Sequence, residues 1–179
     1  MSGKFKCDEP MREQKLAARF GTSRGPVRDA LMQLTQEGVL EYQPNKGVRV
    51  SSLLTDEERD VVVAMRLELE KYCIQKFISI ATKEDFKNIS VLLERLKNAC
   101  EVASLPEVAE SDLALHRYWV AQASPHLEST WLGLSVRMIM KYSRLENYDQ
   151  AIEEHSRIVE ALLGRNIDKA IYYLGENIL

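Results

Sequence analysis

The chain is poor in cysteine and has no long hydrophobic run. Its three cysteines, Cys7, Cys73 and Cys100, are odd in number and form no CxxC pair, which favours reduced thiols over a disulfide framework. No apolar stretch approaches the roughly 18 residues that a transmembrane helix needs, and no secretory signal opens the chain. We therefore expect a cytoplasmic protein that does not enter a membrane.

Charge is unevenly distributed along the chain. Residues 1–52 carry nine Lys or Arg and six Asp or Glu, a net of +3, whereas the remaining residues carry fifteen and twenty-one, a net of −6. A basic head on an acidic chain is typical of a protein of which one domain contacts a polyanion. The length of 179 residues leaves room for this head and for one larger body.

Two short helical patterns flank Gly21-Thr22 in the head. Leu16 and Ala17 lie on one face of the first, and Gly21 supplies the permissive backbone at which a helix can end. Ser23 offers an oxygen to cap the second helix, which carries Pro26 in its first turn and ends at Gly38. This spacing predicts a helix-turn-helix.

A β-hairpin is expected directly after the second helix. Residues 39–42 and 48–50 alternate in the manner of strands, and Pro44-Asn45-Lys46-Gly47 reads as the turn between them. A hairpin in this place makes the head a winged helix-turn-helix.

Arg24 and Arg28 suggest a function for this fold, which is binding to DNA. They lie four residues apart at the start of the second helix, so both project from one face, while Leu31 and Leu34 need the opposite side for packing. Residues at the N-terminus of the second helix reach base edges in helix-turn-helix docking, and arginine grips guanine or phosphate with two donors. The alternative is that the two arginines only keep a surface solvated.

From Thr55 onward the sequence predicts helices alone. Thr55 and Glu58 form a capping box, and the apolar face of the helix that follows is assigned to Val61, Val62, Met65, Leu69, Cys73 and Phe77. Further helices are expected from Thr82 to Ala103, Val108 to Ala123, Leu127 to Leu145, Tyr148 to Leu163 and Lys169 to the end of the chain. The predicted fold is mainly α, with a winged helix-turn-helix at 1–52 and an antiparallel all-α helical bundle at 55–179.

Three polar residues fall on faces that the pattern assigns to the core. Asp112 and His116 share the apolar stripe of the third body helix, and His155 lies on the inner face of the fifth. Burying these groups alone would cost several kcal/mol, and a divalent ion such as Zn²⁺ or another first-row metal would offset that cost. The alternative is a simple hydrogen bond between Asp112 and His116, which are one helical turn apart.

The stretch SRGPVRDALMQLTQEGVLEYQPNKGVRV resembles the DNA-binding domain of the GntR family of bacterial transcription regulators. The resemblance implies a dimer that binds double-stranded operator DNA through Ser23, Arg24 and Arg28, with Gln14 close to the DNA backbone. It also implies that Asn45, Lys46 and Gly47 bring the tip of the wing to the minor groove. The family's domain usually opens with one more helix, which the polar residues before Met11 do not supply, so we expect the natural N-terminus to lie further upstream.

The body resembles the all-helical FCD effector domain of the FadR-type branch of the family, through DLALHRYWVAQASPHLE and EEHSRIVEALLGRNIDKA. That resemblance implies metal ligands at Asp112, His116 and His155, with Asn177 in place of a fourth ligand. Asn is a poorer ligand for Zn²⁺ than the imidazole usual at that position.

The same resemblance implies a small carboxylate effector that alters the spacing of the two heads in a homodimer. Arg66 and Arg137 are the candidates for binding its anionic group because each borders an apolar face, and Ser135 and Tyr142 could add hydroxyls. Each arginine could equally point outward, with Arg66 pairing with Glu70 one turn away.

Two other function classes fit parts of the sequence. A metal-dependent hydrolase could use Asp112, His116 and His155 to activate water, but no residue is placed as a general base and the basic head would have no role. A winged helix could also bind an acidic protein instead of DNA. We expect a regulator and not an enzyme.

Overall fold

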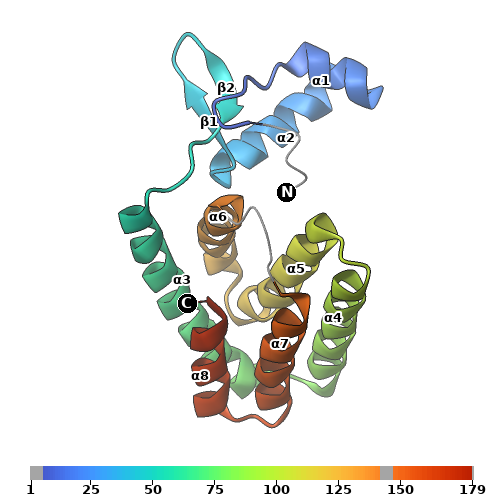
Figure 1. The fold of residues 1–179 in the computed structure, drawn as a ribbon, viewed down its shortest axis with the longest axis vertical. Helices are drawn as coiled ribbons and strands as arrows, with labels where there is room; N and C mark the ends of the chain where they lie inside the picture. Colours follow the sequence, from blue (N-terminus) through green and yellow to red (C-terminus); the bar gives the residue numbers. More distant parts are fainter. Residues whose placement is uncertain (1–5, 142–146, 179) are drawn as a thin grey trace.

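The computed structural model describes residues 6–141 and 147–178 and confirms a mainly helical chain with a small antiparallel sheet (Figure 1). The head contains α1 (Glu13–Phe20), α2 (Arg24–Gln36), β1 (Leu40–Gln43) and β2 (Gly47–Val50). The bundle contains α3 (Asp56–Ile80), α4 (Lys83–Glu101), α5 (Leu105–Ala123), α6 (Pro125–Lys141), α7 (Tyr148–Leu163) and α8 (Ile167–Ile178).

The helix-turn-helix and the wing form where the sequence places them. α1 ends at Gly21, whose φ of 62° satisfies the left-handed conformation at this helix end. β1 pairs with β2 from Leu40 opposite Val50 to Gln43 opposite Gly47. Ser23 occupies the N-cap position of α2, but its side chain makes no capping hydrogen bond, so that part of the prediction is wrong.

α3 is the long helix that crosses the bundle, and its buried face differs from the one predicted. Val61 and Met65 are exposed, whereas Arg66 and Glu70 are buried together with Cys73 and Phe77. The prediction assigned only apolar residues to the buried face of α3. The predicted face is therefore rotated about the helix axis relative to the observed one, which includes charged residues. The capping box of Thr55 and Glu58 is confirmed.

Several of the remaining helix boundaries also differ from the prediction, including the end of α4 at Glu101 and the start of α8 at Ile167. α5 begins at Leu105 instead of Val108, because Pro106 is accommodated in its first turn. α6 begins at Pro125 instead of Leu127 and is described to Lys141, so the predicted end at Leu145 lies outside the described residues.

The bundle core is formed where α5 packs against α3, α4 and α6, and α7 packs against α4 and α8. The largest side chains that are fully buried in it include Phe77, Trp119 and Trp131. Across residues 6–141 and 147–178, no helix combines the length and apolar character that crossing a membrane requires.

α6 lies in the bundle next to the head (Figure 1), and two stripes of its residues face different ways. The bundle side carries Trp131, Ser135 and Met138, and the head side carries Gly133, Arg137 and Met140. A Cβ on Gly133 would lie 3.5 Å from the carbonyl oxygen of Glu37, just after α2. A Cβ on Gly38 would lie 2.7 Å from Nε of Arg137, so only a residue without a side chain lets this guanidinium approach.

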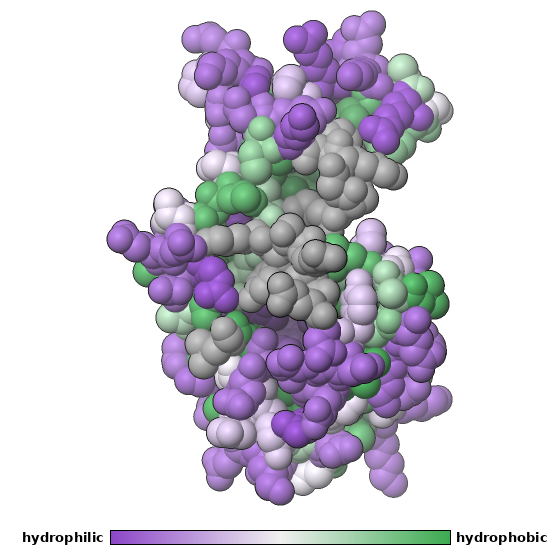
Figure 2. Space-filling view, in the orientation of Figure 1, coloured by the Kyte–Doolittle hydropathy of each residue, from purple (hydrophilic) through white to green (hydrophobic). Residues whose placement is uncertain are grey.

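The space-filling view shows hydrophilic residues over most of the head and over the lower end of the bundle (Figure 2). Hydrophobic residues gather at the level where the head meets the bundle. The predicted domain boundaries at residues 52 and 55 fall in the segment between β2 and α3.

Candidate nucleic-acid interface and candidate metal centre

The first turns of α2 carry the two arginines on an exposed face of the head. The side chains of Arg24 and Arg28 are 64% and 57% exposed, whereas Val27 and Leu31 on the opposite side of α2 are buried. The two guanidinium groups are therefore accessible to a partner from solvent. Ser23 and Gln14 are also exposed, at the end of the turn and on α1 respectively.

Glu13, the first residue of α1, lies between the two guanidinium groups. Its Oε2 is 3.0 Å from Nη2 of Arg24 and 3.0 Å from Nη2 of Arg28, and its Oε1 is 2.9 Å from Nε of Arg28. Hydrogen bonds from Arg28 and then from Arg24 lower the pKa of Glu13 to about 2. Sequence reasoning missed this residue because it lies 11 and 15 positions away from its partners, beyond any local periodicity.

The wing places its tip beside α2. Asn45 and Gly47 have φ angles of 64° and 78°, which form the tight connection between the strands, and Lys46 between them is exposed. A groove of about 720 Å³ separates the wing from α2, and Arg28 and Lys46 are among the residues that line it. Cationic side chains from both elements therefore face one groove.

Inside the bundle, the structure brings together the three residues that the sequence singled out. Asp112 and His116 come from α5 and His155 comes from α7, and one ligand atom of each lies within 4.8 Å of the other two. Nε2 of His155 is 2.8 Å from Oδ1 of Asp112 and 3.3 Å from Nε2 of His116. Both histidines are buried.

The far nitrogens of the two imidazole rings are held by acceptors. Nδ1 of His155 donates to the carbonyl oxygen of Ala151 at 2.7 Å, and Nδ1 of His116 lies 2.8 Å from Oε2 of Glu70. Each ring that donates from Nδ1 keeps a lone pair on Nε2 when it is neutral. The two lone pairs and the carboxylate of Asp112 then converge on one another.

This donor set fits a divalent cation. Three lone pairs that face each other repel unless a proton or a metal ion lies among them, and a partner on the far nitrogen is typical of histidines that ligate metals. In a tetrahedral site with metal–nitrogen bonds of about 2.0–2.1 Å, ligand atoms lie about 3.3 Å apart. The 3.3 Å between the two Nε2 atoms agrees with that spacing, whereas Oδ1 of Asp112 lies 2.8 Å from Nε2 of His155 and 3.9 Å from Nε2 of His116.

The pKa values follow the same contacts. Burial raises the pKa of Asp112, but the hydrogen bond from His155 and the charges of His116, His155 and Arg66 outweigh it, so the pKa falls below its usual value. Burial lowers the pKa of His155, but the hydrogen bond and the charge of Asp112 raise it overall.

Glu70 is the site residue that sequence reasoning placed outside the core. It is fully buried, and its Oε1 accepts from Nε of Arg66 at 2.7 Å and from Nε1 of Trp131 at 2.6 Å, while Oε2 lies next to His116. The structure thus settles the orientation of Arg66, which points into the bundle and pairs with Glu70 at the same time. The sequence signal that could have revealed the buried Glu70 is its position four residues after an Arg that points inward.

The other predicted residues lie elsewhere. Asn177 on α8 donates from Nδ2 to Glu154 of α7 at 3.0 Å, and its place as a fourth ligand stays a prediction. Arg137 is exposed and its guanidinium lies against Gly38 of the head, and its assignment to an effector site stays a prediction. Ser135 is buried in the bundle, and Tyr142 lies outside the described residues.

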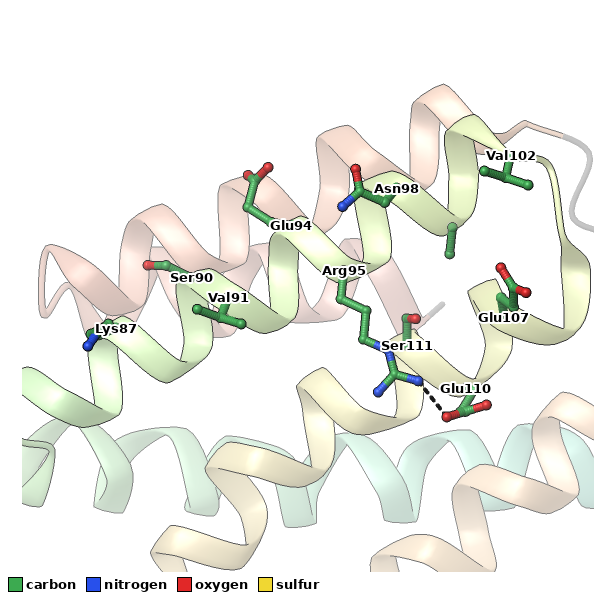
Figure 3. Close-up of a pocket in the computed structure, with 11 residues that line it drawn as sticks. Lys87, Ser90, Val91, Glu94, Arg95, Asn98, Val102, Glu107, Glu110 and Ser111 are labelled. Atoms are coloured by element: carbon green, nitrogen blue, oxygen red, sulfur yellow. Dashed lines mark hydrogen bonds and ion pairs between the residues drawn. The ribbon is translucent and has the colours of Figure 1, made fainter.

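A second groove, of about 840 Å³, lies on the outer face of α4 and α5 (Figure 3). Lys87 lies near one end of it and Glu107 near the other, and Arg95 forms an ion pair with Glu110 across it. This groove is separate from the buried cluster.

Comparison with known proteins follows the division between head and bundle. The family model described as bacterial regulatory proteins of the gntR family matches residues 1–50, and the model of the FCD domain matches residues 61–177. The chain belongs to the GntR family.

Curated relatives of this GntR-family chain are transcription regulators. A probable D-xylose utilization operon transcriptional repressor from Paenarthrobacter nicotinovorans is 30% identical and covers 89% of this chain and 72% of the relative. The gluconate operon transcriptional repressor of Bacillus subtilis is 24% identical and covers 99% of this chain and 76% of the relative. Among solved structures, E. coli McbR/YncC has a TM-score of 0.82 at 21% identity, with 98% of this chain and 86% of that chain covered.

These matches decide between the function classes. The chain is a DNA-binding transcription regulator with an FCD effector domain and is not an enzyme, so the hydrolase hypothesis is not supported. The hypothesis of a winged helix used for protein contacts is not favoured either.

The buried pair of Glu70 and Arg66 generates a stability prediction. Glu70→Leu leaves the Arg66 guanidinium buried without its partner, and it should lower the free energy of unfolding by about 3–5 kcal/mol. The double variant Glu70→Leu/Arg66→Met should lose less, because no unpaired charge remains. Urea denaturation in the presence of a chelator measures both, and equal losses in the two variants would contradict the prediction.

Proposed function

We propose that this GntR-family regulator represses an operon by binding its operator through the exposed arginines of α2, and that a small carboxylate effector in the bundle controls this binding. The observation that carries the proposal is the pair of guanidinium groups, more than half exposed, at the N-terminus of the recognition helix. In this position an arginine can reach guanine O6 and N7 with two hydrogen bonds.

The remaining DNA contacts follow from the exposed residues around α2. Arg24 and Arg28 would read bases in the major groove, and Gln14 and Ser23 would bind the phosphate backbone. At the tip of the wing, Asn45, Lys46 and Gly47 would approach the minor groove, where the positive φ angles keep the backbone compact. The cytoplasm is the compartment in which such a protein would meet its operator.

Asp112, His116 and His155 would hold a divalent cation, Zn²⁺ or another first-row metal ion. The converging lone pairs and the supported far nitrogens of both imidazoles favour this assignment. A bound cation would supply positive charge that neutralises Asp112 and attracts an anionic effector. Asn177 would contribute little to the site, because an amide oxygen is a poorer ligand for Zn²⁺ than an imidazole, and its Nδ2 donates to Glu154.

A small organic acid is the effector that suits the buried groups near this cluster. Within the described residues, Trp119 Nε1 and Ser135 Oγ are the buried side-chain atoms without a hydrogen-bond partner, and the Trp119 ring lies 4.5 Å from the ring of His116. These two donors and Arg66 could bind carboxylate and hydroxyl oxygens. Relatives named as repressors of gluconate and D-xylose utilization operons support an effector related to a carbon source.

α6 would couple the effector site to the head. Trp131 donates to Glu70, which lies next to His116, and two residues further along the helix Gly133 faces Glu37 behind the recognition helix. A shift of His116 or Glu70 would therefore be transmitted to α2 through one rigid helix. Regulation requires a coupling of only ~1–3 kcal/mol.

The regulator would act as a homodimer. Val91 and Val102 on α4 are 62% and 72% exposed in the groove of Figure 3, which has Lys87 near one end and Glu107 near the other. A second copy in antiparallel orientation would bring each lysine close to the acidic end of its partner's groove, as twofold symmetry requires. This charge complementarity makes the α4–α5 groove our candidate for the dimer surface.

A variant of Arg28 on α2, the proposed recognition helix, tests the proposed binding to operator DNA. Arg28→Ala should weaken binding to a duplex enriched from a random pool by about 1–3 kcal/mol, because base contacts are lost. His116→Ala should leave the DNA affinity of the metal-free protein mostly intact. Lys76→Ala is the control for charge, because it removes one exposed positive charge far from the head. Gel-shift titration measures all three, and equal losses for Arg28→Ala and Lys76→Ala would refute specific recognition.

The coupling through α6 is tested with Zn²⁺ alone as the probe. Trp131→Phe removes the indole donor to Glu70 but keeps an aromatic ring in the core. We expect its Zn²⁺ affinity to stay within about tenfold of the wild type. The change that Zn²⁺ causes in duplex affinity should shrink, as measured by fluorescence anisotropy with and without the ion.

Two variants serve as controls for this experiment. His155→Ala should lose both Zn²⁺ binding and its effect on DNA, whereas Asn177→Ala should keep both. If Trp131→Phe responds to Zn²⁺ as fully as the wild type does, α6 does not carry the coupling through this hydrogen bond. If the wild type does not bind Zn²⁺, the metal assignment itself is wrong for that ion.

A charged residue introduced into the α4–α5 groove tests the proposed dimer surface. Val91→Glu should raise the dimer dissociation constant by at least about tenfold, because a carboxylate would have to leave water on association. Val61→Glu is the matched control, since Val61 is equally exposed on α3, at 60%, and outside the groove. Sedimentation velocity would show monomer for the first variant only, and a dimer in both would exclude this surface.

A further inference from the structure

Glu13 uses both of its carboxylate oxygens on the two arginines of α2. Arg24 approaches with Nε at 3.3 Å and Nη2 at 3.0 Å, and Arg28 with Nε at 2.9 Å and Nη2 at 3.0 Å. Only 26% of the Glu13 side chain is exposed, although both partners are more than half exposed. The Glu13 side chain is thus less exposed than either arginine that it binds.

The edge of each guanidinium that Glu13 binds determines what remains free. An arginine has five N–H donors, and the bonds to Glu13 occupy the side formed by Nε and Nη2. The Nη1 end, with two donors, and one hydrogen of Nη2 stay available to an external partner. These donors are sufficient for a bidentate contact with guanine.

A carboxylate at this position carries a cost for a protein that binds DNA. Its negative charge offsets one of the two positive charges that Arg24 and Arg28 would otherwise offer to phosphates. Non-specific binding is then weaker, because the protein neutralises fewer phosphates. Its benefit is order, because two long side chains that are already fixed lose less entropy on docking. α1 and α2 do not need it for packing, since Ala17, Val27 and Leu31 already form a buried contact between them.

We propose that Glu13 is a positioning residue for operator recognition, which holds Arg24 and Arg28 in one shared orientation and so raises specificity at the expense of non-specific affinity. This inference rests on the proposed function only in that the two arginines contact bases. It assigns no contact with DNA to Glu13 itself. The effect should therefore appear in the ratio of specific to non-specific affinity.

The test compares two probes with one isosteric variant. The probes are a duplex enriched from a random pool by the wild-type protein and a scrambled duplex of the same composition. Glu13→Gln should bind the scrambled duplex more tightly, with a salt slope steeper by about 0.9. Its preference for the enriched duplex should fall about 3- to 10-fold, because the arginines are no longer fixed.

Two further variants separate position from charge. Asp29→Asn removes a negative charge from α2 next to Arg28, whose pKa Asp29 raises through its charge. It should strengthen binding to both duplexes equally and leave the preference unchanged. Glu13→Asp keeps the charge on a shorter side chain, and it should lower the preference without strengthening binding to the scrambled duplex.

The outcomes distinguish this proposal from the function on which it rests. If Glu13→Gln strengthens binding to both duplexes equally, as Asp29→Asn should, Glu13 acts through charge alone and the proposal is overturned. If Glu13→Asp keeps the full preference for the enriched duplex, the position of the carboxylate does not determine that preference, and the proposal is also overturned. A wild-type protein that shows no preference, or whose preference survives Arg24→Ala and Arg28→Ala, would instead refute base reading by the two arginines.

Discussion

The buried carboxylate of Glu70 is the constraint on which the effector domain depends. An isolated carboxylate in the interior of a protein is costly, so its position is tolerated only while its partners remain in place. Those partners come from three helices: Arg66 from α3 itself, His116 from α5 and Trp131 from α6. The same contacts fix the ring of His116, so the requirement that stabilises the bundle also sets the direction in which the Nε2 lone pair points.

A similar arrangement supports the head. Glu13 contacts Arg24 and Arg28 as Glu70 contacts His116, because in both places an acidic residue on a neighbouring element binds side chains that we propose as ligand contacts. The two acids differ in surroundings. Glu70 is fully buried and contributes to stability, whereas the contacts of Glu13 lie at the surface, where ion pairs contribute little to stability and mainly order the side chains.

Much of the fold and part of the site could be predicted from the sequence, and the particular residues show why. The turn at Gly21, the hairpin and the capping box of Thr55 are encoded by neighbouring residues, and the structure reproduces them. Asp112 and His116 stood out because polar groups interrupted an apolar stripe. Glu13 was missed because its partners are distant in the sequence, and the contacts of Glu70 with His116 and Trp131 were missed for the same reason. The contact of Arg137 with the head was not foreseen, because periodicity does not reveal which neighbour a helix face meets.

The contact between head and bundle has a consequence for the modularity of such regulators. At Gly38 and Gly133 it depends on the absence of a side chain on the glycine, while Arg137 and Met140 are the side chains of α6 that meet the head. The two parts are joined covalently by a short segment between β2 and α3. Heads with different reading residues could therefore be grafted onto one sensor body at this segment, provided that a residue without a side chain is kept at the end of the recognition helix.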